Sequence, residues 1–281
     1  MSSRKPSGAF GEFWEIVKTL LWAAVIAIVI RTFAYEPFNI PSGSMIPTLL
    51  VGDYLFVSKT AYGYSKFSFP GGIVPVEGRI WEGAPKRGDV VVFRPPGELE
   101  TDFIKRVIGL PGDRIQVING ILHINGQPVQ RQAIQSYVDP DDPEMREIPQ
   151  YLETLPGGVT HPILEQQEDH GMFDNTPVYV VPPDHYFMMG DNRDNSNDSR
   201  AWDTSRLQVD ATSDEGKQAI LHTEIDASKA DWLDKVGFVP KENLIGPAKI
   251  LFWSYDSSSK WYNPITWVTA LRFGRLLNVI K

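Results

Sequence analysis

The feature that most constrains this chain is an uninterrupted apolar run near its N-terminus, Leu20–Ile30 (LLWAAVIAIVI). The run alone is short for a membrane helix, because crossing the hydrocarbon core takes about 20 predominantly apolar residues. Flanking apolar and aromatic residues extend it to that length over residues 13–35, and Lys18 and Arg31 can then reach opposite interfaces. The pattern therefore predicts a single transmembrane anchor.

A cleaved signal peptide is the alternative, since Arg4 and Lys5 precede the run and Thr32-Phe33-Ala34 is similar to a cleavage site. Arg31 lies between the run and that tripeptide, where signal peptides avoid charge, so we expect a retained anchor. The two basic residues favour a cytoplasmic tail over residues 1–12, which places residues 36–281 on the extracytoplasmic side.

Charge and composition exclude several classes of protein. A formal net charge of −8 and a pI near 5.2 argue against nucleic acid as a partner, because phosphate binding needs a basic surface. The absence of cysteine removes disulfides, thiolate nucleophiles and cysteine metal sites. The 23 Gly and 22 Pro predict many turns and short strands.

The remaining chain reads as short strands separated by turns, and Asn119-Gly120 and Asn125-Gly126 are typical of hairpins. We therefore predict a mainly β, antiparallel domain behind a single N-terminal transmembrane helix. The runs rich in Val, Ile and aromatic residues are Asp53–Val57, Asp89–Arg94, Phe103–Ile108, Arg114–Ile118, Ile121–Ile124, Val178–Val181 and Ala248–Trp253.

Two segments have the composition of insertions. Residues 139–175 are rich in Pro, Asp and Glu, which predicts long surface loops. Residues 203–236 are polar and partly helical in pattern, with Thr212 and Glu215 forming a candidate capping box. The C-terminal tail, residues 261–281, combines aromatic and basic residues, and either packs on the body or contacts lipid headgroups.

The histidines lie at positions 123, 161, 170, 185 and 222, and none falls in a recognisable catalytic motif. His161 and His170 lie in the acidic segment and His222 in the second insertion, so we expect all three to be solvated.

Two polar segments are flanked by apolar sequence. The first, Ile40–Leu49, presents serines between two prolines; the second is Gly190–Arg200, GDNRDNSNDSR. A calcium loop starting at Asp194 fails by position, because Ser199 lies where glycine is required and Ser205 where glutamate is required. Its alternating acids and arginines predict a self-paired, hydrogen-bonded loop instead.

Between these segments lies a strand pattern that contains two adjacent cations, Lys105 and Arg106. Alternate residues of a strand share a face, so one of the two is expected on a buried face. Arginine stays protonated, whereas a desolvated lysine can lose its proton near neutral pH. Lys105 is therefore the candidate base, and a lysine whose amine simply reaches solvent is the alternative.

Five segments in this order resemble the bacterial type I signal peptidase family. They are PSGSMIPTL (41–49), GDVVVF (88–93), DFIKRVIGLPGD (102–113), GDNRDNSNDSR (190–200) and GFVPKENLIG (237–246). The resemblance covers the anchor and most of the body. It implies a catalytic core of residues 36–110, 178–202 and 237–281, a β-rich subdomain with the acidic loop over 111–177, and an additional insertion over 203–236.

The resemblance also implies the roles of the matched residues. Ser44 would be the nucleophile and Lys105 its general base. The Ser44 backbone N–H and the Ser42 hydroxyl would form the oxyanion hole, and Ser196 would hydrogen-bond and orient Lys105. Structural support would come from Asp191, Arg193, Asp198 and Arg200.

By the same resemblance, the substrates are secretory preproteins, cut after a signal sequence with small residues before the cut. The expected location is the inner (plasma) membrane, with lipid as a further partner, and the chemistry requires no metal or organic cofactor. A non-catalytic, membrane-anchored β-rich binding module is the alternative. A self-cleaving serine–lysine peptidase joined to a DNA-binding domain fits less well, because an apolar segment replaces the helical domain.

Overall fold

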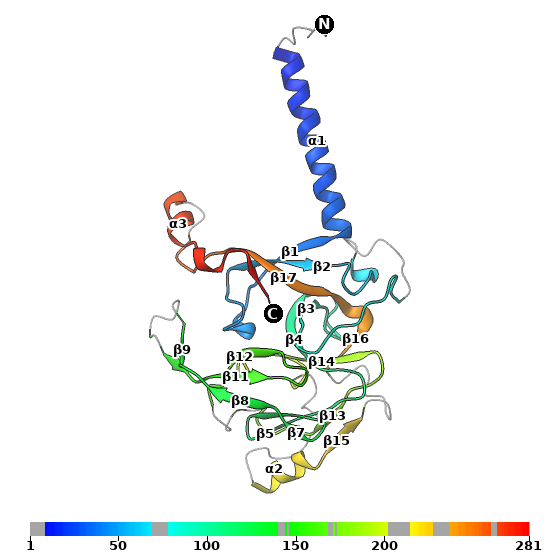
Figure 1. The fold of residues 1–281 in the computed structure, drawn as a ribbon, viewed down its shortest axis with the longest axis vertical. Helices are drawn as coiled ribbons and strands as arrows, with labels where there is room; N and C mark the ends of the chain where they lie inside the picture. The colour runs from blue at the N-terminus through cyan, green and yellow to red at the C-terminus, as the bar shows by residue number, and fades with distance from the viewer. Residues whose placement is uncertain are drawn as a thin grey trace.

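The computed structural model describes residues 9–68, 78–139, 144, 146–167, 171, 173–201, 214–226, 237–259 and 263–280. One long N-terminal helix, α1 (Ala9–Phe33), extends away from a body whose main elements are β-strands (Figure 1). The prediction of a mainly antiparallel β fold behind an apolar helix is confirmed. Among the described strand pairs, β13 with β15 is the one parallel exception.

Helix α1 carries no buried surface along its most apolar part. It is long and apolar enough over Gly11–Phe33 to cross a membrane, and that window is 0% buried inside the protein. Its 25 residues span roughly 37 Å at about 1.5 Å per residue. The helix ends two residues earlier than the predicted anchor, because Tyr35 already pairs with Ser58 as the first residue of β1.

The largest sheet has the strand order β1-β2-β17-β3-β4-β14-β16, with β18 paired to β17. Each strand run predicted from the sequence overlaps a strand of the structure. The strands of this sheet are β1 (Tyr35–Asn39), β2 (Asp53–Ser58), β3 (Val90–Phe93), β4 (Phe103–Gly109), β14 (His185–Met189), β16 (Phe238–Pro240), β17 (Leu244–Ser254) and β18 (Asn278–Val279).

Three smaller sheets form the part of the body farther from α1 (Figure 1). The five-stranded sheet runs β15-β13-β5-β6-β7, the three-stranded sheet β12-β11-β8, and β9 pairs with β10. Their strands are β5 (Arg114–Ile118), β6 (Ile121–Ile124), β7 (Gln127–Pro128), β8 (Gln130–Ala133), β9 (Tyr137–Val138), β10 (Glu147–Ile148), β11 (Gln150–Thr154), β12 (Thr160–Leu164), β13 (Val178–Val180) and β15 (Glu224–Asp226).

The prediction that residues 139–175 form surface loops is wrong for much of the segment. Strands β11 and β12 form an antiparallel hairpin there, and β11 also pairs with β8. The hairpin turn uses Gly157 and Gly158, both with positive φ. Within this acidic, proline-rich segment, β12 buries His161, Ile163 and Leu164, and Leu155, directly after β11, is buried as well.

The described part of the second insertion is also integrated into the body. Helix α2 (Asp214–Leu221) leads into β15, which pairs with β13, and Ile225 of β15 packs in the core. The amide of Gln116 on β5 donates to the carbonyl of Leu221 at 2.9 Å. Thr212, half of the predicted capping box, lies outside the described residues.

Strand β3 is buried on both faces and separates two parts of the core. Val90 and Val92 pack with Met45, Leu49 and other residues around the Ile40–Leu49 segment, whereas Val91 lies in a second cluster on the opposite face. Residues between two packed layers read as a continuous apolar run, which explains the sequence VVVF.

The junction between α1 and the body is short and closely bonded. The backbone N–H of Lys59 donates to the carbonyl of Ala34 at 3.0 Å, and the Tyr64 hydroxyl donates to the carbonyl of Phe33. The Lys59 amine, 1% exposed, pairs with Glu36 at 2.9 Å. The helix is therefore fixed to β1 and β2 without a flexible linker.

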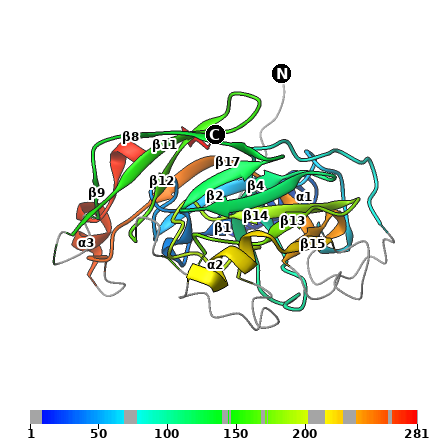
Figure 2. The same cartoon turned by 90° about the horizontal axis from the view of Figure 1, so that it is seen from below.

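The C-terminal tail packs partly on the body. Arg275 pairs with buried Asp53, and Ala270 is buried. Short helix α3 (Pro264–Thr269) and the following turn leave Phe273 and Leu277 exposed. In both views α3 and β9 lie on the same side of the body (Figures 1 and 2). The described tail thus combines a packed part with exposed apolar side chains.

We predict that Leu55→Ala lowers the free energy of unfolding by about 2–5 kcal/mol, because it empties a fully buried site under the Ile40–Leu49 segment. The matched control is Leu99→Ala, which removes the same atoms from a side chain that is 43% exposed, and should change stability by less than about 1 kcal/mol. Urea unfolding of the full chain in detergent, followed by tryptophan fluorescence, measures both. Equal losses would contradict this description of the core.

Candidate active site

Ser44 lies in a single 3₁₀ turn, Gly43–Met45, between β1 and β2. Ser44 and Met45 are buried, and Met45 anchors the turn in the core beside Leu49. Asn192 holds the turn from the other side. Its backbone N–H donates to the carbonyl of Ser44 at 3.1 Å, and its side-chain Nδ2 donates to the carbonyl of Gly43 at 3.1 Å.

The amine of Lys105 on β4 lies directly against this turn. Its Nζ donates to Oγ of Ser44 at 2.7 Å and to the carbonyl of Ile104 at 3.0 Å. Lys105 is 3% exposed, and its Nζ lies 5.6 Å from the centre of the Phe103 ring. Burial lowers the pKa of Lys105 to about 8, while the charges of Asp198 and Asp191 act against that shift. A substantial fraction of this amine is therefore neutral near pH 8.

Arg106, the other cation of the pair, is also buried, although the strand pattern predicted only one. It forms a bidentate ion pair with Asp191, with Nε to Oδ1 at 2.9 Å and Nη2 to Oδ2 at 2.7 Å. Its Nη1 donates to the carbonyl of Gly88, and the Thr48 hydroxyl donates to Asp191 at 2.5 Å. Burial alone would raise the pKa of Asp191, but Arg106 holds it below its usual value.

A second buried pair lies behind the first. Arg193 donates through both terminal nitrogens to the carboxylate of Glu153 on β11. His161 lies between the two pairs, with Nε2 3.4 Å from Glu153 and 3.7 Å from Asp191. The expectation that His161 is solvated is wrong: it is 1% exposed, and burial lowers its pKa to about 4. His222 is exposed, and His170 lies outside the described residues.

A third buried pair closes the 190–200 loop on itself. Arg200 donates to both oxygens of Asp198, at 3.0 and 2.9 Å, and to the carbonyl of Arg193. The backbone N–H of Gly190 also donates to Asp198 at 2.9 Å. The loop is thus self-paired only in part, because Asp191 and Arg193 find their partners on other strands, at Arg106 and Glu153.

Ser42 and Ser196 show less of their expected geometry. Ser42 precedes the turn with an extended backbone and is exposed. The expected hydrogen bond from Ser196 to Lys105 is not formed; the buried hydroxyl of Ser196 instead helps to lower the pKa of Asp198. Ser196 still lies close to the turn: a Cβ at Gly190 would be 2.2 Å from its Oγ and 2.5 Å from the carbonyl of Ser44. Only glycine fits there.

The sequence analysis missed Arg106, Thr48, Glu153 and Asn192, all of which contact the loops that carry Ser44 or Asp191. For Arg106 the available signal was its position between Ile104 and Ile108, which already indicated a buried side chain. Glu153 lies in the segment interpreted as a loop, so its sequence context gave no such signal.

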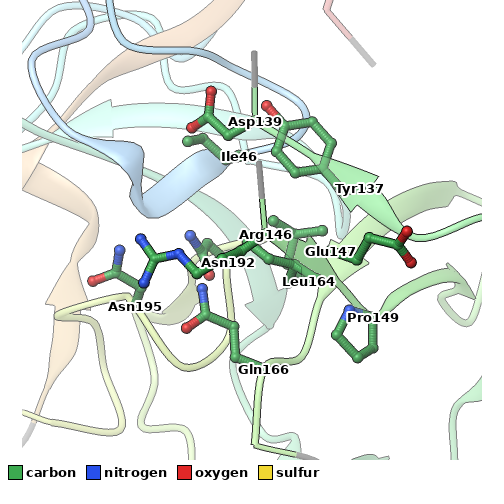
Figure 3. A pocket seen from close by; sticks show the side chains of 11 residues that line it. Ile46, Tyr137, Asp139, Arg146, Glu147, Pro149, Leu164, Gln166, Asn192 and Asn195 are labelled. Carbon is green, nitrogen blue, oxygen red and sulfur yellow. The ribbon is translucent and has the colours of Figure 1, made fainter. Parts of the chain in front are cut away.

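A cavity of about 660 Å³ opens beside the Ser44 turn (Figure 3). Ile46, Leu164 and Asn192 line it, together with polar and apolar side chains of β9, β10, the residues beside these strands, Gln166 and the 190–200 loop. The Oδ1 atom of Asn192 is buried and makes no hydrogen bond to the described residues. The cavity therefore offers space beside the turn that carries Ser44.

An antiparallel β body with a buried amine against a serine hydroxyl is typical of serine hydrolases that use lysine in place of histidine. The profile of the family described as "Signal peptidase, peptidase S26" matches residues 13–253. The chain therefore belongs to the signal peptidase family, peptidase S26. Membership supports removal of signal peptides by a peptidase, and the N-terminal apolar helix is consistent with the membrane anchor of that family.

Relatives share most of the chain's length. Signal peptidase I of Rickettsia canadensis is 35% identical over 277 residues, covering 92% of this chain and 90% of the relative. Signal peptidase I of Rickettsia prowazekii is 35% identical over 292 residues, covering 98% and 94%. Among solved structures, a signal peptidase I from Enterococcus faecalis is 20% identical and covers 59% of this chain and 97% of its own; its TM-score of 0.28 is too low to bear on the fold.

We predict that Asp191→Asn lowers the free energy of unfolding by about 3–5 kcal/mol, because it leaves the fully buried Arg106 without its anion. The matched control is Asp102→Asn, whose partner Arg94 is 30% exposed; that change should cost less than about 1 kcal/mol. Chemical unfolding of the full chain measures both. A loss below 1 kcal/mol at Asp191 would show that the buried pair does not stabilise the site.

Proposed function

We propose that the chain is a membrane-anchored serine endopeptidase that removes signal peptides from exported preproteins, with Ser44 as nucleophile and Lys105 as general base. The observation that carries this proposal is the 2.7 Å contact between Nζ of Lys105 and Oγ of Ser44 in a buried environment. Serine is a weak nucleophile until a base accepts its proton during attack. A neutral amine at this distance can accept that proton.

The reaction would proceed in two steps with Lys105 as the only proton carrier. Oγ of Ser44 attacks the scissile carbonyl carbon while Nζ of Lys105 takes the hydroxyl proton. The tetrahedral intermediate then expels the amine of the mature protein, which receives that proton. Lys105 then takes a proton from water, which attacks the acyl-enzyme; Oγ of Ser44 leaves and receives that proton from Lys105, and the signal peptide is released as its carboxylic acid. This chemistry requires no metal or organic cofactor.

We propose that the backbone N–H of Ser44 and the hydroxyl of Ser42 donate hydrogen bonds to the oxyanion. The Ser42 hydroxyl makes no capping hydrogen bond to the 3₁₀ turn that follows it. One such donor is typically worth about 3–4 kcal/mol of the barrier. Ser196 can act on Lys105 only if its hydroxyl turns towards Nζ, so we propose it as a positioning residue. Asp191, Arg193, Asp198 and Arg200 would hold the site through buried ion pairs.

Substrate binding is supported by unpaired strand edges near Ser44. Strand β1 is the edge of its sheet, and in the described register β14 pairs with β4 from Arg106 onwards and does not extend along Ile104 and Lys105. An extended peptide can add to such an edge and place alternate side chains in pockets. The cavity beside Asn192 then offers space for residues on the other side of the cut.

The membrane topology is part of the same proposal. We propose that α1 spans the inner membrane with its N-terminus in the cytoplasm, following the basic residues Arg4 and Lys5. Ser44 follows Phe33, the last residue of α1, by only eleven positions. Such an anchor keeps the site close to the extracytoplasmic surface of the inner membrane, where the cleavage region of a signal sequence emerges.

We predict that Ser44→Ala and Lys105→Ala each lower kcat/KM for a signal-sequence peptide by at least about 10³-fold. Lys105→Arg should be equally inactive, because guanidinium stays protonated. Cleavage is measured by mass spectrometry with the full chain in detergent. The exposed Lys86→Ala is the matched control and should retain wild-type activity.

Circular dichroism must show that the inactive variants are folded. Normal cleavage by folded Ser44→Ala would refute the nucleophile and favour a non-catalytic binding module. Wild-type rate in Lys105→Arg would show that the lysine supplies charge and is not the base.

The pH dependence follows from the depressed pKa of Lys105, about 8. The base works only when neutral, so kcat/KM should fall as the pH drops through that value, by roughly 50- to 100-fold between pH 9 and pH 6. Initial rates at constant ionic strength measure the profile, with circular dichroism at each pH as the folding control. A flat profile from pH 9 to pH 5 would rule out a titrating lysine.

A further inference from the structure

Three carboxylates converge outside the proposed dyad. Glu165 directly follows β12, Asp174 ends a turn that begins at Gly171, and Asp194 belongs to the 190–200 loop. One oxygen of each lies within 4.8 Å of the others. Glu165 and Asp174 are each 2% exposed. Three acids this close, two of them out of water, repel one another unless a cation or a proton lies between them.

The chain supplies little compensation for Glu165. Among the residues that the structure describes, no group donates a hydrogen bond to its buried Oε1. Asp194 accepts the backbone N–H groups of Gln166 and Gln167, at 2.6 and 3.0 Å. Burial and the charges of Asp194 and Asp174 raise the pKa of Glu165 to about 8. Arg193, which acts against this shift, is held in its bidentate pair with Glu153. The buried carboxylate of Glu165 therefore lies beside two further carboxylates, and its Oε1 has no donor among the described residues.

The backbone is shaped around these oxygens. At Gly171 an added Cβ would lie 2.3 Å from Oδ1 of Asp194 and 3.0 Å from both side-chain oxygens of Asp174. The N–H of Gly171 donates to Asp174 at 2.5 Å. A side chain at this position would collide with the carboxylates, so the glycine keeps the space beside them open.

We propose that Glu165, Asp174 and Asp194 form a binding site for a divalent cation, with Ca²⁺ preferred. Carboxylate oxygens are ligands for hard cations, and Ca²⁺ binds them at about 2.3–2.6 Å in flexible geometry. The three ligand atoms lie within 4.8 Å of one another, close enough for one such ion to contact all of them. Mg²⁺ requires about 2.0–2.1 Å and stricter octahedral geometry, so it should bind more weakly.

A cation here would connect three segments that surround the candidate active site. The end of β12 is already bonded to the 190–200 loop by two backbone hydrogen bonds of 2.9 Å. The N–H of Leu164 donates to the backbone carbonyl of Asp191, and the N–H of Arg193 donates to the backbone carbonyl of Leu164. The 171–174 turn contacts the same loop where Phe173 lies against the guanidinium of Arg200. The ion would stabilise this loop without taking part in the reaction.

The test measures the thermal unfolding of the full chain in detergent, after chelation and with Ca²⁺ or Mg²⁺ added to 10 mM. With a dissociation constant of about 0.1–1 mM, Ca²⁺ should raise the Tm of the wild type by roughly 3–10 °C, and Mg²⁺ by less. Glu165→Gln should lose this response. In chelator its Tm should equal or exceed that of the wild type, because an amide relieves the repulsion.

Glu98→Gln makes the same change at an exposed position and should respond to Ca²⁺ like the wild type. If Glu165→Gln does not fold, Asp194→Asn serves instead, since an amide oxygen still accepts the two backbone N–H groups. Isothermal titration should show one Ca²⁺ per chain. Ser44→Ala must respond fully, which separates this test from the peptidase proposal. An unchanged Ca²⁺ response in the variant, a stronger response to Mg²⁺, or no response in the wild type overturns the site.

Discussion

The bidentate ion pair between Arg106 and Asp191 is the contact on which the arrangement of the candidate site depends. Arg106 follows Lys105 on β4, and Asp191 precedes Asn192, which holds the carbonyl of Ser44. The Arg106–Asp191 pair therefore fixes strand β4, which carries Lys105, against the 190–200 loop, whose Asn192 holds the turn of Ser44. Neither charge has access to water, so the loss of either partner would leave the other charge buried and uncompensated.

Burial has opposite consequences for neighbouring cations on β4. Arg106 keeps its charge because Asp191 lies within hydrogen-bonding distance on two sides. Among the described residues, Lys105 has no such carboxylate partner; its neighbours are a hydroxyl, a carbonyl and an aromatic ring, and burial lowers its pKa. The same removal of water that strengthens one ion pair makes the adjacent amine available as a base.

Much of the fold and of the candidate site could be predicted because the relevant signals are local. Val-rich runs gave the strands of the central sheet, and the cation pair indicated burial on β4. Strands β11 and β12 were missed because acidic and proline-rich neighbours masked their alternation. The carboxylate cluster could not be predicted at all, since its members are brought together only by the hairpin and the loop folding onto each other.

The junction of α1 with the body has a mechanical consequence. Ala34 alone separates the helix from β1, and bonds from Lys59 and Tyr64 leave no free hinge between them. With α1 spanning the bilayer as proposed, the tilt of the helix sets the height and orientation of Ser44 over the lipid. The scissile bond must then reach a serine held at a fixed height above the membrane. The number of residues between the apolar segment of a signal peptide and its cleavage site would therefore determine which preproteins can be cut.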